Sequence, residues 1–202
     1  MKKAATTIFC FVHLFVIAQG WQDVSLNIEN NLRAVQFIDI NHGWIVGDDG
    51  IILKYEDGHW IQIESAFSSN NFTGLYFTGP HHGWIIGESG VILNYNYDTL
   101  SIVDSPTDKR LNDIFMLNDN EGWIGGNDRT ILKYSKNIWT VYPTDNFSDD
   151  LGNLKDVQFL DSTFGIFIGG KNYSGFTILN YEDGEWYEDN NPTNTTWLKG
   201  LY

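Results

Sequence analysis

The sequence predicts an all-β protein, a β-propeller built from four-stranded antiparallel blades, of which four are present. Two observations carry this prediction: a motif that recurs about every 40 residues, and strand-like segments within each repeat. A Gly followed by Trp or Ile falls at Gly43, Gly83, Gly122 and Gly165, so the repeats are spaced by 40, 39 and 43 residues. Repeats of this length, each forming one small sheet, are typical of propeller blades.

Each repeat contains four short segments that have the composition of strands. The first segments read LRAVQFID, FTGLYFTG, LNDIFMLN and LKDVQFLD, and the second read GWIVG, GWIIG, GWIGG and GIFIG. The third segments read IILKY, VILNY, TILKY and TILNY, and the fourth begin at Trp60, Leu100, Trp139 and Trp186. They are rich in β-branched and aromatic residues and bounded by Gly, Asp or Asn, which is typical of strands. No stretch shows the 3.6-residue period of a helix.

The turn residues predict how the four strands of a repeat connect. Asp-Gly pairs such as Asp49-Gly50, Asp57-Gly58 and Asp183-Gly184 suit tight hairpins, because Gly adopts a positive φ without steric cost. A single meander of this kind cannot cover both faces of its sheet, whereas radially stacked neighbours can. The predicted blades are 32–71, 72–110, 111–153 and 154–196. The recurring Trp44, Trp84 and Trp123 are expected to pack between blades.

The first 20 residues predict a secretory signal peptide. Lys2 and Lys3 precede an apolar run from Ile8 to Ala18, and Ala18-Gln19-Gly20 supplies the small residues of a cleavage site. The run is shorter than the ~20 residues that a bilayer core requires. We therefore expect cleavage after Gly20, no membrane insertion after cleavage, and a periplasmic, cell-surface or extracellular location.

Charge and cysteine usage restrict the partners of the exported chain. The sequence carries a formal charge of −14, and removal of residues 1–20 leaves 10 Lys and Arg against 26 Asp and Glu, a formal −16. This balance argues against nucleic acids and anionic membrane surfaces, which attract basic patches. Cleavage also removes Cys10, which is the only cysteine, so the domain rests on its hydrophobic core.

Both ends of the repeat region predict an incomplete propeller. Residues 21–31 resemble an outer strand of the kind that closes a propeller ring, because Trp21-x-x-Val24 matches the fourth-strand pattern at Trp60. Residues 197–202 resemble the start of a fifth blade. The expected structure is an open arc of four blades.

The motifs of this chain resemble a known family. Gly-Trp-x-x-Gly, Gly-x-Ile-Leu-x-Tyr and Asp-Gly-x-Trp, present from Leu32 to Asp189, resemble photosystem II stability/assembly factor-like propellers, relatives of the sialidase-type Asp-box (BNR-like) repeat proteins. The Asp-box itself is shortened here to YEDGHW and YEDGEW, and it is eroded to YNYDTL and YSKNIW in the other two blades. In that family the box is a folding element, so the resemblance implies a fold and no catalytic site.

Candidate ligand-binding residues lie in the predicted turns. They are four acidic residues between second and third strands and one aromatic residue in an insertion of the fourth blade: Asp48, Asp49, Glu88, Asp128 and Tyr173. The acidic set lacks the D-x-D-x-D-G spacing of a Ca²⁺ loop, so we predict no metal and no cofactor. The variable connectors Glu64–Asn71, Asp104–Arg110, Pro143–Asn153 and Asp189–Thr196 are expected on the same face, where a partner would bind.

The sequence favours binding over catalysis. Sialidases on this scaffold grip a carboxylate with three arginines, but Arg33, Arg110 and Arg129 occupy different places in their blades, and no G-x-S-x-G, H-E-x-x-H or phosphate loop is present. We predict a non-catalytic binding or assembly module for a protein or glycan partner, with an oligomeric state that the sequence leaves open. The alternative is a glycan-active hydrolase of the sialidase-like propeller type, with catalytic residues partly in missing blades.

Overall fold

The structure is a computed structural model that describes residues 26, 28–171 and 175–189. The predicted signal peptide, residues 21–25 of the N-terminal segment, Tyr173, and the predicted start of a fifth blade lie outside the described residues. Residues 28–31 lead into the first strand. No helix in the described ranges is long and apolar enough to cross a membrane.

In the described residues, sixteen strands form four sheets, each a meander of four strands in sequence order. The first sheet consists of β1 (Leu32–Phe37), β2 (Gly43–Gly47), β3 (Ile52–Glu56) and β4 (His59–Gln62). The second consists of β5 (Phe72–Gly79), β6 (His82–Gly87), β7 (Ile92–Asn96) and β8 (Thr99–Ile102). The third consists of β9 (Leu111–Asn118), β10 (Glu121–Gly126), β11 (Ile131–Ser135) and β12 (Ile138–Val141). The fourth consists of β13 (Leu151–Phe159), β14 (Gly165–Lys171), β15 (Phe176–Glu182) and β16 (Glu185–Glu188).

The fourth sheet differs slightly from the others in its first strand. β13 begins at Leu151, three residues before the expected start of the fourth blade at Leu154. Leu151 pairs with Lys171 at the end of β14, and the register shifts twice before Asp156. The antiparallel pairing of β13 and β14 therefore begins three residues earlier than the sequence repeat predicts.

The hairpins between third and fourth strands keep one geometry although their sequences differ. Asp57-Gly58 and Asp183-Gly184 have positive φ at both residues, as the Asp-Gly pairs predict. The two eroded hairpins reach the same region without Gly, at Tyr97-Asp98 (φ 44° and 62°) and at Lys136-Asn137 (φ 52° and 64°). The tertiary fold thus imposes the turn where the local sequence no longer favours it.

Tryptophans fill the spaces between consecutive sheets, as predicted. Trp44 of the first sheet stacks on Phe77 of the second, with ring centroids 3.8 Å apart and an interplanar angle of 11°. Trp84 meets Tyr134 and Trp139 of the third sheet edge-on, at 4.9 and 5.4 Å. Trp123 is fully buried against the fourth sheet. Three hydrophobic clusters, one per interface, form the core.

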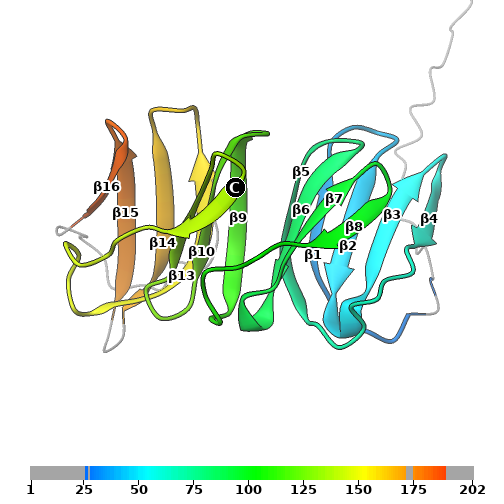
Figure 1. Cartoon of the computed structure of the whole chain (residues 1–202), viewed down its shortest axis with the longest axis horizontal. Coiled ribbons are helices and arrows are strands. Elements are labelled where there is room, and N and C mark those ends of the chain that lie inside the picture. Colours follow the sequence, from blue (N-terminus) through cyan, green and yellow to red (C-terminus); the bar gives the residue numbers. More distant parts are fainter. Residues whose placement is uncertain (1–25, 27, 172–174, 190–202) are drawn as a thin grey trace, which may run out of the picture.

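The four blades form an open arc, which confirms the predicted fold class. The inner strands contact one another in the order β1, β5, β9 and β13. Figure 1 shows the row from the first sheet, whose β3 and β4 lie at the right end, to the fourth, whose β15 and β16 lie at the left end. Within the part of the chain that the structure describes, the first and fourth sheets do not meet to close a ring.

Candidate functional site

Turns between second and third strands meet the connectors between blades, so both lie on one face of the arc. The Gly50 N–H donates to the carbonyl oxygen of Asn70 at 2.7 Å, and the Glu88 N–H donates to that of Asn71 at 2.9 Å. In the third blade, the Arg129 N–H donates to the Gly152 carbonyl at 3.2 Å. The contacts place the connectors 64–71 and 143–153 beside these turns, on the face predicted for partner binding.

Two of the predicted ligand-binding acids are held by arginines on this face. Arg33 donates to both carboxylate oxygens of Asp48, from Nη2 at 2.9 Å, and Asn31 Nδ2 donates to the same group at 2.9 Å. The Arg33 hydrogen bond is the main reason that the pKa of Asp48 is lowered. Glu88 is bound in the same way by Arg110 and by Asn71 Nδ2, the latter at 3.0 Å.

The other two acids lie at the tips of their turns. Asp49 accepts a hydrogen bond from Asn30 at 3.1 Å, and Asp128 lies 3.4 Å from the Lys109 ammonium. The backbone N–H of Asp128 donates to Asn153 Oδ1 at 3.0 Å. The four acids share a face but each has its own local partner. Among the described residues, no group of three or more His, Cys, Asp or Glu side chains could hold a metal ion.

The three arginines are likewise separate from one another in function. Arg33 and Arg110 pair with Asp48 and Glu88, whereas Arg129 donates to the carbonyl oxygen of Thr144 at 2.7 Å. Each guanidinium therefore holds a turn or connector of the scaffold, and the three do not converge on one carboxylate position.

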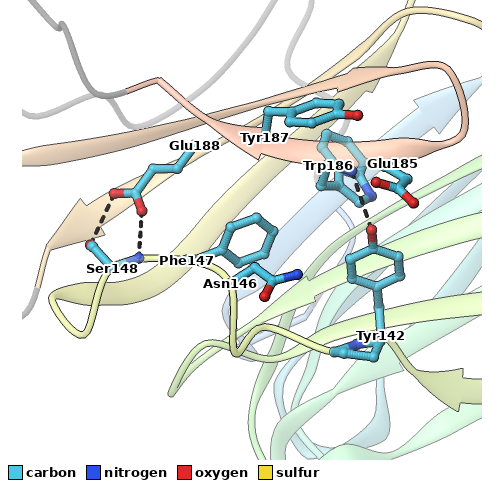
Figure 2. A pocket seen from close by; sticks show the side chains of 9 residues that line it. Tyr142, Asn146, Phe147, Ser148, Glu185, Trp186, Tyr187 and Glu188 are labelled. Carbon is cyan, nitrogen blue, oxygen red and sulfur yellow. Dashed lines mark hydrogen bonds between the residues drawn. The ribbon is translucent and has the colours of Figure 1, made fainter.

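A groove lies where the connector between the third and fourth blades passes β16. It has a volume of about 730 Å³. Figure 2 shows its lining, which comes from the connector and from β16: Tyr142, Pro143, Asn146, Phe147, Ser148, Glu185, Trp186, Tyr187 and Glu188. β16 is the outermost strand of the fourth sheet, so the groove runs along a sheet edge.

Hydrogen bonds across the groove fix its two walls. The backbone N–H of Trp186 donates to the Tyr142 hydroxyl at 3.3 Å. At the other end, Glu188 accepts bonds from the Ser148 N–H at 2.7 Å and from the Ser148 hydroxyl at 3.0 Å, and Lys171 lies 3.2 Å away. Burial tends to raise the pKa of Glu188, but the Ser148 and Lys171 contacts outweigh it, and the pKa lies below its usual value. An ionised Glu188 therefore joins the two walls of the groove through its contacts with Ser148 and Lys171.

The mouth of the groove combines aromatic and acidic surface. Tyr187 is 50% exposed and Glu185 is also exposed, while Phe147 and Trp186, which line the same groove, are buried. Aromatic rings offer contact area at low entropic cost, and a carboxylate favours basic or amide groups. This arrangement suits a chain segment that presents an apolar side chain beside a basic one.

Comparisons with known proteins agree with the fold. The family model described as Photosynthesis system II assembly factor YCF48 matches residues 15–93. A solved structure of YCF48 bound to D1 peptide aligns with a TM-score of 0.61 at 21% identity, covering 81% of this chain and 54% of that chain. The structure of YCF48 from Cyanidioschyzon merolae aligns with a TM-score of 0.65 at 23% identity, covering 83% of this chain and 59% of that chain. The chain is similar to this family over residues 15–93, and it shares the β-propeller fold of the YCF48 structures.

The likeness to these YCF48 structures is one of fold. This chain spans little more than half the length of either solved structure. No curated protein matches it. The predicted resemblance is therefore confirmed for the architecture, and the partner has to be argued from this propeller's own residues.

Sequence reasoning placed the turn acids but missed the groove. Asp48, Asp49, Glu88 and Asp128 lie on the expected face, and their role as ligand-binding residues stays a prediction, as does that of Tyr173. The groove depends on a connector of irregular structure lying against a strand some 40 residues later. The one signal in the sequence is the cluster Trp186-Tyr187-Glu188, where two aromatic residues and an acid adjoin in a fourth strand.

Proposed function

We propose that this propeller is a non-catalytic binding or assembly module that holds an extended segment of a protein partner in the groove beside β16. The observation that supports this proposal is the groove, which is lined by exposed Tyr187 and Glu185 together with buried Phe147 and Trp186. The solved structure of YCF48 bound to D1 peptide supports the proposal, because it is a propeller of the same fold in complex with a peptide.

The charge of the chain restricts the segment that the groove would take. The formal charge is −14, and Glu185 and Glu188 both line the groove. A segment with Lys or Arg beside an aromatic or aliphatic residue would gain from electrostatic attraction and from burial of its apolar side chain. We propose a basic-apolar peptide segment as the ligand class.

Selection from a random peptide library followed by calorimetric titration tests this function. Peptides that bind the wild-type chain should lose at least about tenfold in affinity for Tyr187→Ala and for Glu185→Gln, which corresponds to ~1.4 kcal/mol. Tyr97→Ala is the matched control, because Tyr97 is 66% exposed on the second blade. Equal losses for Tyr187→Ala and Tyr97→Ala, or no loss for either, would refute binding in the groove.

A glycan is the alternative ligand for the same groove. Sugars stack on exposed aromatic rings, so Tyr187 would serve a glycan as well as a peptide. A glycan array probed with the wild-type chain and with Tyr187→Ala would detect such binding. Screening of fluorogenic glycosides tests the hydrolase alternative, which no feature of the groove favours.

We further propose that the chain acts outside the cytoplasm. The support is the basic, apolar and small-residue order of residues 1–20, which is typical of a secretory signal. N-terminal sequencing of the exported protein should give Trp21 as the first residue. A product that keeps Met1 would contradict export through this segment.

A further inference from the structure

The groove beside β16 reaches both faces of the fourth sheet. Its lining includes the whole of β16, from Glu185 to Glu188. Successive side chains of a strand point to opposite faces of a sheet, so one hollow can touch all of them only where it passes the edge of that sheet. Trp186 packs on Trp123 of the third blade, and Tyr187 therefore points to the opposite face. The groove thus follows the outer edge of β16.

The backbone groups of β16 point alternately to β15 and to the groove. The Asp189 N–H donates to the Ile178 carbonyl of β15 at 2.8 Å, whereas the backbone N–H of Trp186 points away from β15 to the Tyr142 hydroxyl. In an antiparallel ladder the backbone groups of alternate residues point to the same side, so those of Glu188 also face the groove. Among the described residues no further strand pairs with β16. This edge can therefore accept another strand.

The Tyr142 hydroxyl occupies the place that the carbonyl of an added strand would take. The N–H groups of Ile63, Val103 and Tyr142 each donate to the third strand of their own blade at 2.9 Å, so these residues share one position of the repeat. Ile63 and Val103 are aliphatic and pack against the interface that follows their blade. Tyr142 packs its ring on Trp123 at 5.4 Å and adds a hydroxyl that meets the β16 edge at 3.3 Å. That bond is longer than most N–H···O bonds, so a carbonyl could replace it.

The outer strand is exposed in every blade. The residues at the position of Tyr187 in the first three blades are Ile61, Ser101 and Thr140. All are exposed, although a further blade follows each of them. Tyr187 therefore owes its exposure to its place on the outer strand, and both walls of the groove belong to the third and fourth blades.

We propose that the ligand of the groove is an extended peptide segment that adds to the fourth sheet as a fifth strand, beside β16. This inference rests on the proposed function, because it states how the segment binds. A carbonyl of the segment accepts the Trp186 N–H in place of the Tyr142 hydroxyl, and the segment also pairs with the backbone of Glu188. The four residues of β16 span ~13 Å, so about four or five residues of the segment cover the edge.

The two sides of the edge select an alternating sequence. Side chains on one face of the added strand lie beside Tyr187 and Glu185, where an exposed carboxylate favours Lys or Arg. Side chains on the other face lie towards Phe147 and Tyr142 of the connector, where apolar groups are buried. The ligand class is a strand in which basic and apolar residues alternate, with no proline at the residues whose N–H groups face β16.

Calorimetric titration with N-methylated peptides tests the strand addition. The parent is a peptide selected for binding to the wild-type chain, and each derivative carries one N-methyl group, which removes one main-chain N–H. Alternate N–H groups of an added strand face its neighbour. Methylation at every second residue should therefore weaken binding by at least about tenfold, and methylation at the residues between should change it by less than about twofold.

Tyr142→Phe gives a second measurement with the opposite sign. The variant loses the hydroxyl that competes for the Trp186 N–H and keeps the ring on Trp123. Its affinity for the parent peptide should rise by about 2–10-fold, which corresponds to one hydrogen bond. Tyr55→Phe on the first blade is the matched control and should leave the affinity unchanged. An unchanged or lower affinity for Tyr142→Phe would contradict the transfer of the Trp186 N–H to the peptide.

The outcomes distinguish this inference from the proposed function. If binding depends on Tyr187 but the effects of N-methylation lack a period of two residues, strand addition is wrong and binding in the groove stands. If no selected peptide depends on Tyr187, both proposals are wrong. A period of two residues together with a loss for Tyr187→Ala would support both.

Discussion

Asp113 should make the stability of the propeller depend on pH. Its carboxylate oxygen Oδ2 accepts the N–H of Val157 in the next blade at 2.8 Å, and its side chain also meets that of Asp156. Burial raises the pKa of Asp113 to about 8, and the neighbouring charge of Asp156 acts in the same direction. The folded protein therefore holds a proton at Asp113 at neutral pH.

The sign of the pH effect follows from the two states. In the unfolded chain Asp113 has the ordinary pKa of 3.8, so between about pH 4 and pH 8 the folded state binds a proton that the unfolded state has lost. The stability contributed by protonated Asp113 is complete below pH 4 and disappears as the pH rises to 8. One pH unit corresponds to about 1.4 kcal/mol for one such group, so the loss between pH 5 and pH 8 approaches about 4 kcal/mol.

Asp113→Asn should remove this dependence. An Asn side chain can accept the Val157 N–H and donate to Asp156, as the protonated acid does, and it does not ionise. We expect its free energy of unfolding, relative to wild type, to rise by up to about 4 kcal/mol from pH 5 to pH 8.

Urea unfolding followed by tryptophan fluorescence at several pH values measures the difference. Asp108→Asn is the control, because the Asp108 side chain is 90% exposed, and its difference from wild type should stay nearly constant. If the difference in free energy of unfolding between Asp113→Asn and wild type is the same at pH 5 and pH 8, Asp113 is not the source of a pH-dependent stability.

Two further predictions concern the packing of the blades. Trp123→Ala should lower the free energy of unfolding by about 3–5 kcal/mol, because the fully buried ring packs against Tyr181 and Trp186 of the fourth blade. Trp60→Ala should cost clearly less, because Trp60 is only partly buried at the outer end of the first blade, and equal costs in urea unfolding would contradict this prediction. Gly87→Ala should cost about 1–3 kcal/mol, because a Cβ there would lie 2.3 Å from the Asn71 carbonyl oxygen. Gly79→Ala, with no atom within 4 Å of its Cβ, should be nearly neutral in thermal unfolding, and similar melting temperatures for the two Ala variants would contradict this.

The repeated parts of the fold could be predicted from the sequence because their signals are local. A Gly-Trp strand, an Ile-Leu-x-Tyr strand and an Asp-Gly turn each specify a short structure, and the interval of about 40 residues sets the blade. Trp44, Trp84 and Trp123 recur at one position of the repeat, so their role between blades could be predicted without coordinates.

The groove and the charge pairs could not be predicted because they depend on residues brought together by the fold. Tyr142 and Trp186 belong to different blades, and neither segment has a sequence pattern that predicts their contact. The sequence does not reveal that Arg33 lies beside Asp48 and Arg110 beside Glu88, because the partners are 15 and 22 residues apart. The left-handed backbone of the hairpin at Tyr97-Asp98 could not be predicted either, because neither residue is the glycine that usually marks such a turn.

Hydrogen–deuterium exchange of the chain with a selected basic-apolar peptide tests peptide binding in the groove, because it locates the bound segment on the propeller. We predict slower exchange of backbone amides in 142–148 and in β16, with unchanged exchange in the first and second blades. Protection confined to the first two blades, with β16 unaffected, would contradict peptide binding in the groove.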